Sequence, residues 1–282
     1  MSAKGWRWAR ASVVGTSHLQ RGQPCQDWSD CQTLRVDGAR TAIVAVVADG
    51  AGSACRAEIG AQLAGSLFLG EMGTFYACGH RAGVLSRQFF EDWLSHFREE
   101  VRARAETEGL APRDFACTLV AAIVEDDRAA FVQVGDGAIV IAAPADPAGY
   151  SCVFWPQRGE YANTTYFATD VDARTRLEFS SYEGRVEEIA LFTDGMQSLA
   201  LEYQSQTAHA PFFRPVFAPI RAEPRGHAEK LSSALASFLG SARVNARTDD
   251  DKTLILASRR KREPRRAGST NGRPDNGERR DR

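Results

Sequence analysis

The sequence predicts an α+β fold, an antiparallel β-sandwich flanked by α-helices on both sides. Apolar segments of β-rich composition outnumber helical segments, and they come in consecutive groups interrupted by two or three long helices. Grouped strands favour antiparallel pairing over the regular strand–helix alternation of a parallel sheet. Because 43% of the 282 residues are hydrophobic, the chain can also bury a sizeable core.

The first strands are expected near the N-terminus, at residues 6–14 and on both sides of Asp37-Gly38. Asp-Gly is a strong signal for a tight hairpin turn, and residues 31–36 and 41–44 flank this pair with strand-forming sequence. We therefore expect a hairpin here.

Three long helices are predicted from apolar residues spaced three or four positions apart. The first carries Ile59, Leu63 and Leu67, and Ser53 is its expected N-cap. The apolar face of the second is formed by Phe89, Phe90, Trp93, Leu94, Phe97 and Val101, and Gly109 is expected to end it. The third carries Leu231, Leu235, Phe238 and Leu239.

The remaining strands are expected at residues 117–124, 129–134 and 139–143, before Asp194, and at residues 253–257. Between them lie two segments whose composition predicts less regular structure. Residues 144–184 should hold loops and short strands, and residues 202–224 form a polar segment that contains prolines.

Residues 1–258 are expected to form one domain and residues 259–282 a basic, disordered tail. The tail has ten basic and four acidic residues, so it carries +6 and leaves about −7 on the body. An acidic body gives no support to nucleic-acid binding.

The sequence also lacks an apolar run of the roughly 18 residues that span a membrane, and its first residues lack the apolar core of a secretion signal. None of the six cysteines forms a Cys-x-x-Cys pair, so buried free thiols are expected. These features predict a soluble cytoplasmic protein.

Acidic residues recur where apolar strands end. Three apolar runs end on Asp49-Gly50, Asp136-Gly137 and Asp194-Gly195, and residues 249–251, all aspartate, precede the strand at residues 253–257. Carboxylates that meet at strand ends repel one another unless a cation neutralises them. The pattern predicts a metal site built from several carboxylates.

A hairpin turn is the alternative meaning of each Asp-Gly pair. It fits Asp49-Gly50 and Asp194-Gly195 poorly, because helical or irregular sequence follows them. For Asp136-Gly137 the two interpretations are evenly balanced, since the apolar residues 139–141 could form a return strand. Motifs for phosphate loops, serine nucleophiles and histidine-bound zinc are absent, so oxygen ligands and Mg²⁺ or Mn²⁺ are expected.

A polar loop at residues 15–27 lies between predicted strands. Its His18, Arg21 and Asp27 could face a phosphate and a metal from one side. Taken singly, each has a commoner structural explanation: an arginine in a loop is usually solvated, and a histidine usually packs or caps.

The order of the motifs resembles the metal-dependent protein phosphatase 2C family, in particular its bacterial branch, over roughly residues 8–258. The pieces are Gln26-Asp27, Asp49-Gly50-Ala51-Gly52, Thr118-Leu119, Gly135-Asp136, Thr193-Asp194-Gly195 and Asp250-Asp251-Lys252-Thr253-Leu254. The resemblance implies a β-sandwich with paired helices on each side and a centre of two Mg²⁺ or Mn²⁺ ions, with a weak third ion possible.

The resemblance also implies the ligands of that centre. Asp49 would bridge two ions, the Gly50 carbonyl would bind one, Asp194 and Asp250 would complete the other, Asp27 would bind or orient a metal-bound water, and Asp136 matches an acid of the third site. The assignment to Asp250 depends on aligning Thr253, and Asp251 is the alternative. His18 stands closest to the arginine that holds phosphate in many relatives, with Arg21 nearby, and either could serve.

The leading hypothesis is a serine/threonine protein phosphatase that hydrolyses phosphoserine and phosphothreonine with metal-activated water. Its expected partners are a phosphorylated protein and a cognate serine/threonine kinase system, and we expect a monomer with no nucleic-acid or membrane partner. Ala51 and Ser198 depart from family positions. With the missing loop arginine, these departures support one alternative, a weak or inactive regulatory or scaffold domain of this fold. A phosphatase of small phosphorylated metabolites is a further alternative, because substrate choice would lie in the variable segments 144–184 and 202–224.

Overall fold

The computed structural model describes all residues other than 1–4, 39, 145–148, 160–164 and 260–282. The predicted tail from residue 260 onward and parts of the segment 144–184 therefore lie outside the described residues. No helix of the described part of the chain is long and apolar enough to span a membrane.

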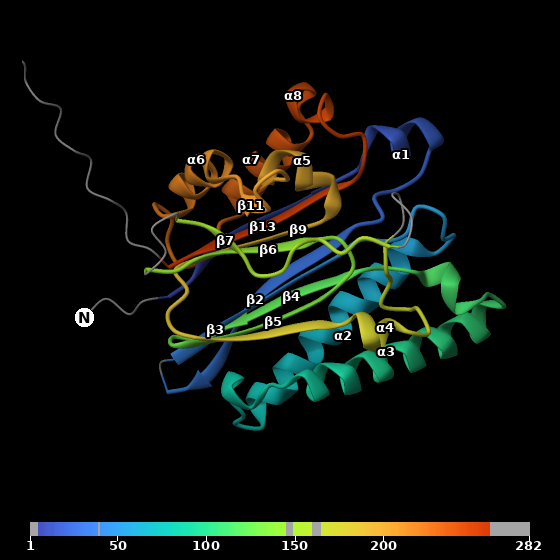
Figure 1. Cartoon of the computed structure of the whole chain (residues 1–282), viewed down its shortest axis with the longest axis horizontal. Coiled ribbons are helices and arrows are strands. Elements are labelled where there is room, and N and C mark those ends of the chain that lie inside the picture. The colour runs from blue at the N-terminus through green and yellow to red at the C-terminus, as the bar shows by residue number, and fades with distance from the viewer. Residues whose placement is uncertain (1–4, 39, 145–148, 160–164, 260–282) are drawn as a thin grey trace, which may run out of the picture.

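Two sheets form the centre of the molecule (Figure 1). The first has the order β12-β1-β13-β9-β6-β7 and consists of Gly226–His227, Arg7–Val13, Lys252–Ser258, Glu188–Phe192, Ala138–Ala142 and Ser151–Cys152. The second has the order β2-β3-β4-β5-β8 and consists of Trp28–Asp37, Arg40–Ala48, Leu119–Val124, Arg128–Val134 and Glu178–Glu183. All neighbouring strands pair antiparallel except β1 and β12.

Helices cover the outer face of each sheet, so the molecule has four layers (Figure 1). The second sheet is covered by α2 (Ala57–Ala77) and α3 (Arg87–Glu108), with α4 (Ala173–Arg176) beside them. Over the first sheet lie α5 (Gln197–Ala200), α6 (Ala210–Ile220) and α7 (Glu229–Leu239). The small elements are α1 (Thr16–Arg21), α8 (Ala242–Asn245), β10 (Leu201–Glu202), β11 (Thr207–Ala208) and the 3₁₀ turns Ala82–Val84, Pro112–Phe115 and Asp194–Met196.

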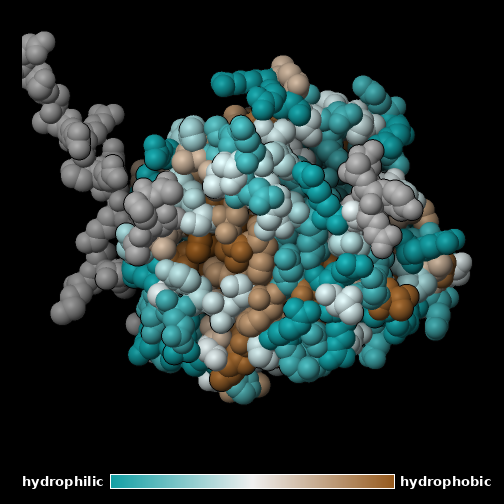
Figure 2. All heavy atoms as spheres, in the orientation of Figure 1, coloured by the Kyte–Doolittle hydropathy of each residue, from teal (hydrophilic) through white to brown (hydrophobic). Residues whose placement is uncertain are grey.

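Apolar side chains fill the spaces between the layers. Ile43, Val120 and Ile255 belong to the cluster between the sheets, and Phe68 and Phe217 to the two clusters under the helices. The exterior is mostly hydrophilic, with hydrophobic surface concentrated at the centre left of the view, between β7 and the second sheet (Figure 2). The predicted α+β sandwich is thus confirmed.

The strand pairing shows whether two of the Asp-Gly pairs, Asp37-Gly38 and Asp136-Gly137, are hairpin turns. The hairpin at Asp37-Gly38 is present, and Gly38 adopts the positive φ of 46° that a glycine tolerates. Asp136-Gly137 is not a hairpin turn, because β5 pairs with β4 and β8 while β6 pairs with β7 and β9. The chain crosses there from one sheet to the other.

Two helix predictions need correction. Ser53 is not the N-cap of the first helix, which begins at Ala57 after Arg56. The segment 202–224, predicted as irregular, contains α6, with Pro215 and Pro219 inside it. Proline removes a backbone donor and normally ends a helix. Here Phe213 and Phe217 are buried under the helix, and their burial outweighs that preference.

Arg259 packs against the body of the molecule. Arg259, which the sequence placed in the tail, is 4% exposed, and its Nε donates to the Val186 carbonyl. The expectation of buried thiols holds for Cys31 and Cys117, whereas Cys55 and Cys78 are exposed.

We expect Gly60→Ala to destabilise the fold by about 1–3 kcal/mol, because a Cβ there would lie 2.0 Å from the Phe115 carbonyl oxygen and would push α2 away. Gly70→Ala in the same helix meets nothing within 4 Å, and it should stabilise by up to about 1 kcal/mol through helix propensity. Urea unfolding of both variants measures the difference. Equal effects of the two substitutions would show that α2 does not need this close approach.

Candidate metal centre

Strand register brings the acidic motifs to one end of the sandwich. Phe192 of β9 lies opposite Leu254 of β13 on one side and opposite Ala138 of β6 on the other. Asp194, which follows β9, is therefore placed beside the residues just before β13 and β6. Those neighbours include Asp136 and Asp250.

The second sheet delivers Asp49 to the same end. Asp49 follows β3, and its backbone is tied to Thr118: its N–H donates to Thr118 Oγ1 at 3.0 Å and its carbonyl accepts from Thr118 N at 2.8 Å. Thr118 precedes β4, whose Leu119 lies opposite Val134 at the end of β5. The Asp49 and Asp136 loops are therefore neighbours.

Oxygen atoms of Asp49, Asp136 and Asp194 all lie within 4.8 Å of one another. Burial raises the pKa of each carboxyl, and the charge of the neighbouring carboxylates raises it further. For Asp136 the pKa rises to about 7. Hard divalent cations that bind oxygen would relieve this repulsion, so the donor set fits Mg²⁺ or Mn²⁺.

Asp27 borders this cluster and is buried. Its Oδ2 accepts a hydrogen bond of 2.8 Å from Thr193 Oγ1, whereas its Oδ1 is buried without a partner among the described side chains. Burial, together with the charges of Asp251 and Asp194, raises the pKa of Asp27. A buried carboxylate oxygen without a donor is the kind of atom that a bound water or cation satisfies.

The structure separates the two candidate aspartates before β13. Asp251 is 2% exposed, and its two oxygens accept 2.6 Å hydrogen bonds from the backbone N–H groups of Gly15 and Gln26. Asp251 thus fastens the first loop to β13. The charge of Asp250 contributes to the raised pKa values of Asp194 and Asp136, and the charge of Asp251 also contributes to that of Asp194.

Glycine is required at two of the Asp-Gly pairs by close packing. A Cβ on Gly50 would lie 2.7 Å from the Ala57 carbonyl oxygen at the start of α2. On Gly195 it would lie 1.9 Å from the Asp251 carbonyl oxygen. These pairs are therefore not turn signals: the glycines let neighbouring backbone approach the aspartates.

The two candidate phosphate-binding residues have their hydrogen-bond and ion-pair partners outside the Asp49, Asp136 and Asp194 cluster. His18 is 4% exposed, with Nδ1 3.0 Å from Asp251 Oδ2 and Nε2 facing Gly52. Arg21 is exposed on α1, and its Nε donates back to the Ser17 carbonyl at 3.1 Å. The structure gives neither residue a contact with Asp49, Asp136 or Asp194 among its hydrogen bonds and ion pairs.

Sequence reasoning used threonines only as motif markers and missed what they do. Thr118 fixes the Asp49 backbone, and Thr193 donates to Asp27. Thr193 Oγ1 also accepts from the backbone N–H of Thr253 at 3.2 Å. Thr193, directly before Asp194, and Thr253, two residues after Asp251, were the available signals.

Comparison with known proteins agrees with this architecture. The sequence profile described as Protein phosphatase 2C matches residues 14–239. "Serine/threonine-protein phosphatase 3" of Escherichia coli (strain K12) is 39% identical over 252 residues, which cover 89% of this chain and 98% of that protein.

Solved structures share the fold at low identity. A bacterial serine phosphatase superposes with a TM-score of 0.60 at 12% identity, covering 91% of this chain and 99% of that one. The catalytic domain of the serine/threonine protein phosphatase PstP, solved with two manganese ions, gives 0.56 at 16% identity, covering 90% and 98%. The chain belongs to the protein phosphatase 2C family. The predicted family is confirmed.

The metal-free protein should lose stability as pH rises. A carboxyl whose pKa is raised by folding binds its proton more tightly in the folded state than in the unfolded state. The ionised Asp136 side chain therefore lowers the free energy of unfolding. This loss grows between about pH 4, the pKa of an aspartate in the unfolded chain, and about pH 7, the pKa of Asp136 in the folded protein. In a chelator, Asp136→Asn should therefore raise the melting temperature at pH 8 and change it little at pH 4. A stabilisation equal at both pH values would contradict the electrostatic cause.

Asp250→Asn and Asp251→Asn should impair different properties, metal binding in the first variant and stability in the second. We expect Asp250→Asn to raise the Mn²⁺ dissociation constant by about tenfold or more while the fold stays intact. Asp251→Asn loses a charged acceptor for two buried N–H groups, which should cost about 1–3 kcal/mol of stability. Calorimetric Mn²⁺ titration and urea unfolding of both variants measure these effects, and a reversed pattern would exchange their roles.

Proposed function

We propose that this chain is a Mg²⁺- or Mn²⁺-dependent serine/threonine protein phosphatase that hydrolyses phosphoserine and phosphothreonine. The observation that carries the proposal is the convergence of Asp49, Asp136 and Asp194 within 4.8 Å at one end of the sandwich. A 39% identical relative that bears the name of a serine/threonine-protein phosphatase supports it.

Each site residue has a part in this proposal. Asp49, the Gly50 carbonyl, Asp194 and Asp250 would hold the metal ions. Asp27 orients a water at the centre, because its Oδ1 is free of protein donors in the described part of the chain. Asp136 lies close enough to Asp49 and Asp194 to serve either these ions or a weaker third one.

When bound, such ions lower the pKa of water and offset charge on phosphoryl oxygens. The protein's part is to hold its carboxylates in place before substrate arrives. Thr118 fixes the backbone of Asp49, Thr193 fixes the side chain of Asp27, and Asp251 fixes the loop that carries Asp27. These contacts come from rigid strand ends, which suits a reaction that depends on the positions of charges.

Protein substrates imply a partner that phosphorylates them, so a serine/threonine kinase system is part of this proposal. We also propose a monomer that acts in the cytoplasm without a membrane or nucleic-acid partner. The acidic body and the exposed polar surface over the helices support this part (Figure 2).

Asp49→Asn and Asp194→Asn should each reduce Mn²⁺-dependent hydrolysis of an aryl phosphate and of a phosphothreonine peptide by about 10³-fold, since each removes a ligand charge worth several kcal/mol in the transition state. Asp92→Asn, an exposed position on α3, is the matched control and should keep activity. Full activity in the Asp49 and Asp194 variants would reject the proposal. Normal Mn²⁺ binding by the wild-type protein with no turnover would favour a regulatory domain.

A further inference from the structure

In the described part of the chain, three basic side chains that the first loop and β13 bring toward the centre already have partners. His18 is engaged with Asp251, Arg21 folds onto its own helix, and Lys252 is buried with its Nζ 3.0 Å from the Asp250 carbonyl oxygen. A phosphomonoester dianion next to so many acids needs a positively charged side chain that can reach it. The loop that follows β7 supplies one, Arg158.

The residue before Arg158 is bound directly to the residue before Asp136. Gln157 Oε1 accepts a 2.8 Å hydrogen bond from Gly135 N–H, and Gln157 N–H donates to the Gly135 carbonyl at 3.3 Å. Gln157 Nε2 also donates to the Arg176 carbonyl at 2.6 Å. This hydrogen bond connects the loop to α4, which precedes β8 of the second sheet. The backbone at Arg158 is therefore held beside the acidic cluster.

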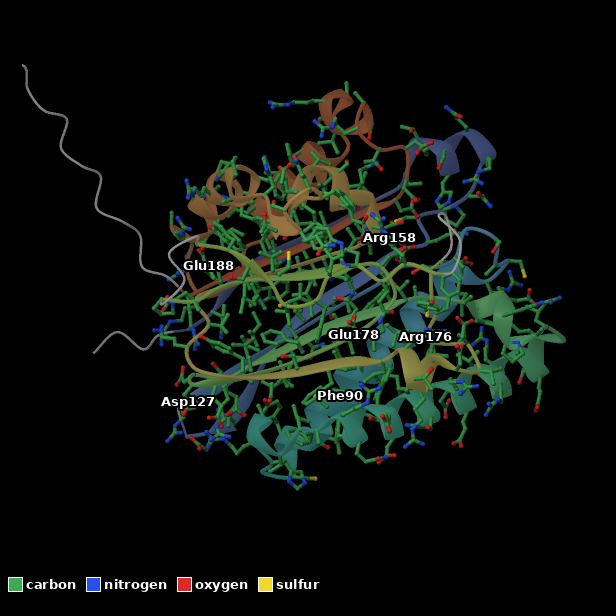
Figure 3. The ribbon with its side chains drawn as sticks, viewed as in Figure 1. Phe90, Asp127, Arg158, Arg176, Glu178 and Glu188 are labelled. Atoms are coloured by element: carbon green, nitrogen blue, oxygen red, sulfur yellow. The ribbon has the colours of Figure 1, made fainter. Side chains whose placement is uncertain are left out.

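The side chain of Arg158 lies over the ring of Tyr203. Its guanidinium carbon lies 5.5 Å from the centre of the Tyr203 ring, and Trp155 packs edge-on against the same ring at 5.5 Å. Figure 3 shows Arg158 on the α5 side of the molecule, away from Arg176 and Glu178.

Tyr203 in turn is connected to the acidic cluster. Its hydroxyl donates to Gln197 Oε1, and Gln197 Nε2 donates to the Asp136 carbonyl at 2.6 Å. Burial and the charges of Asp194 and Asp136 raise the pKa of Tyr203, while the nearby Arg158 opposes that rise. Arg158 and the acidic cluster thus both lie close enough to the Tyr203 phenol to affect its ionisation.

We propose that Arg158 is the residue that binds the substrate's phosphoryl group, with Tyr203 as the residue that positions it. The inference rests on the proposed phosphatase function. Arg158 is exposed, and none of the described carboxylates lies within 4.0 Å of its nitrogens. Its planar guanidinium can donate two parallel hydrogen bonds to phosphoryl oxygens, which an ammonium group cannot do.

The test measures phosphate recognition separately from catalysis. Arg158→Ala should raise KM for an aryl phosphate about tenfold to a hundredfold and weaken calorimetric binding of inorganic phosphate to the Mn²⁺-loaded protein by a similar factor. Arg158→Lys should recover only part of the loss. The control Arg214→Ala removes an exposed arginine on α6 and should change neither quantity.

Tyr203→Phe tests the positioning role, because it keeps the ring under Arg158 and removes the hydrogen bond to Gln197. It should raise KM by a few fold and leave the Mn²⁺ dependence unchanged. The proposal is wrong if Arg158→Ala leaves KM and phosphate binding unchanged, or if Arg21→Ala instead raises KM and weakens phosphate binding. A wild-type protein without turnover would reject the phosphatase function, whereas weaker phosphate binding in Arg158→Ala would still support this site.

Discussion

Mutual repulsion among buried aspartates is the constraint on which the rest of this structure depends. Asp27, Asp49, Asp136 and Asp194 come from four loops, and folding brings them together where burial and their own charges raise their pKa values. A chain folds into such an arrangement only if apolar burial elsewhere supplies the stability. The three apolar clusters between the four layers do so. Hard divalent cations bound at this centre would turn the repulsion into binding energy.

The sandwich suits this task because its strands are fixed on both faces. Residues 43–47 of β3 are completely buried, and β9 and β13 are buried along their whole length. The acidic residues lie next to the ends of such strands. Their backbones are therefore held in place by the packed core. Hydrogen bonds from threonine hydroxyls and to the buried Asp251 also hold the segments that carry the acidic residues.

The substrate side of the centre is built differently. Arg158, Trp155 and Tyr203 lie on loops and short elements outside the two sheets, and they are at least partly exposed. Loops of this kind vary more easily than the strands beneath them. This division would allow the carboxylates to stay fixed while recognition of the phosphate and of the surrounding protein changes.

Local patterns in the sequence determined much of this protein: the grouped strands, the helix over Phe90 to Val101 ended by Gly109, and the acidic residues at strand ends, because all of these depend on neighbours a few positions apart. Only the tertiary structure decided that Asp136-Gly137 crosses between sheets, that α6 forms despite its prolines, and that Asp251 fastens the first loop to β13. No local pattern in the sequence marked Arg158 as a candidate phosphate-binding residue either. The physical reason is that these features arise from contacts between residues far apart in the chain, whose energies override local preference.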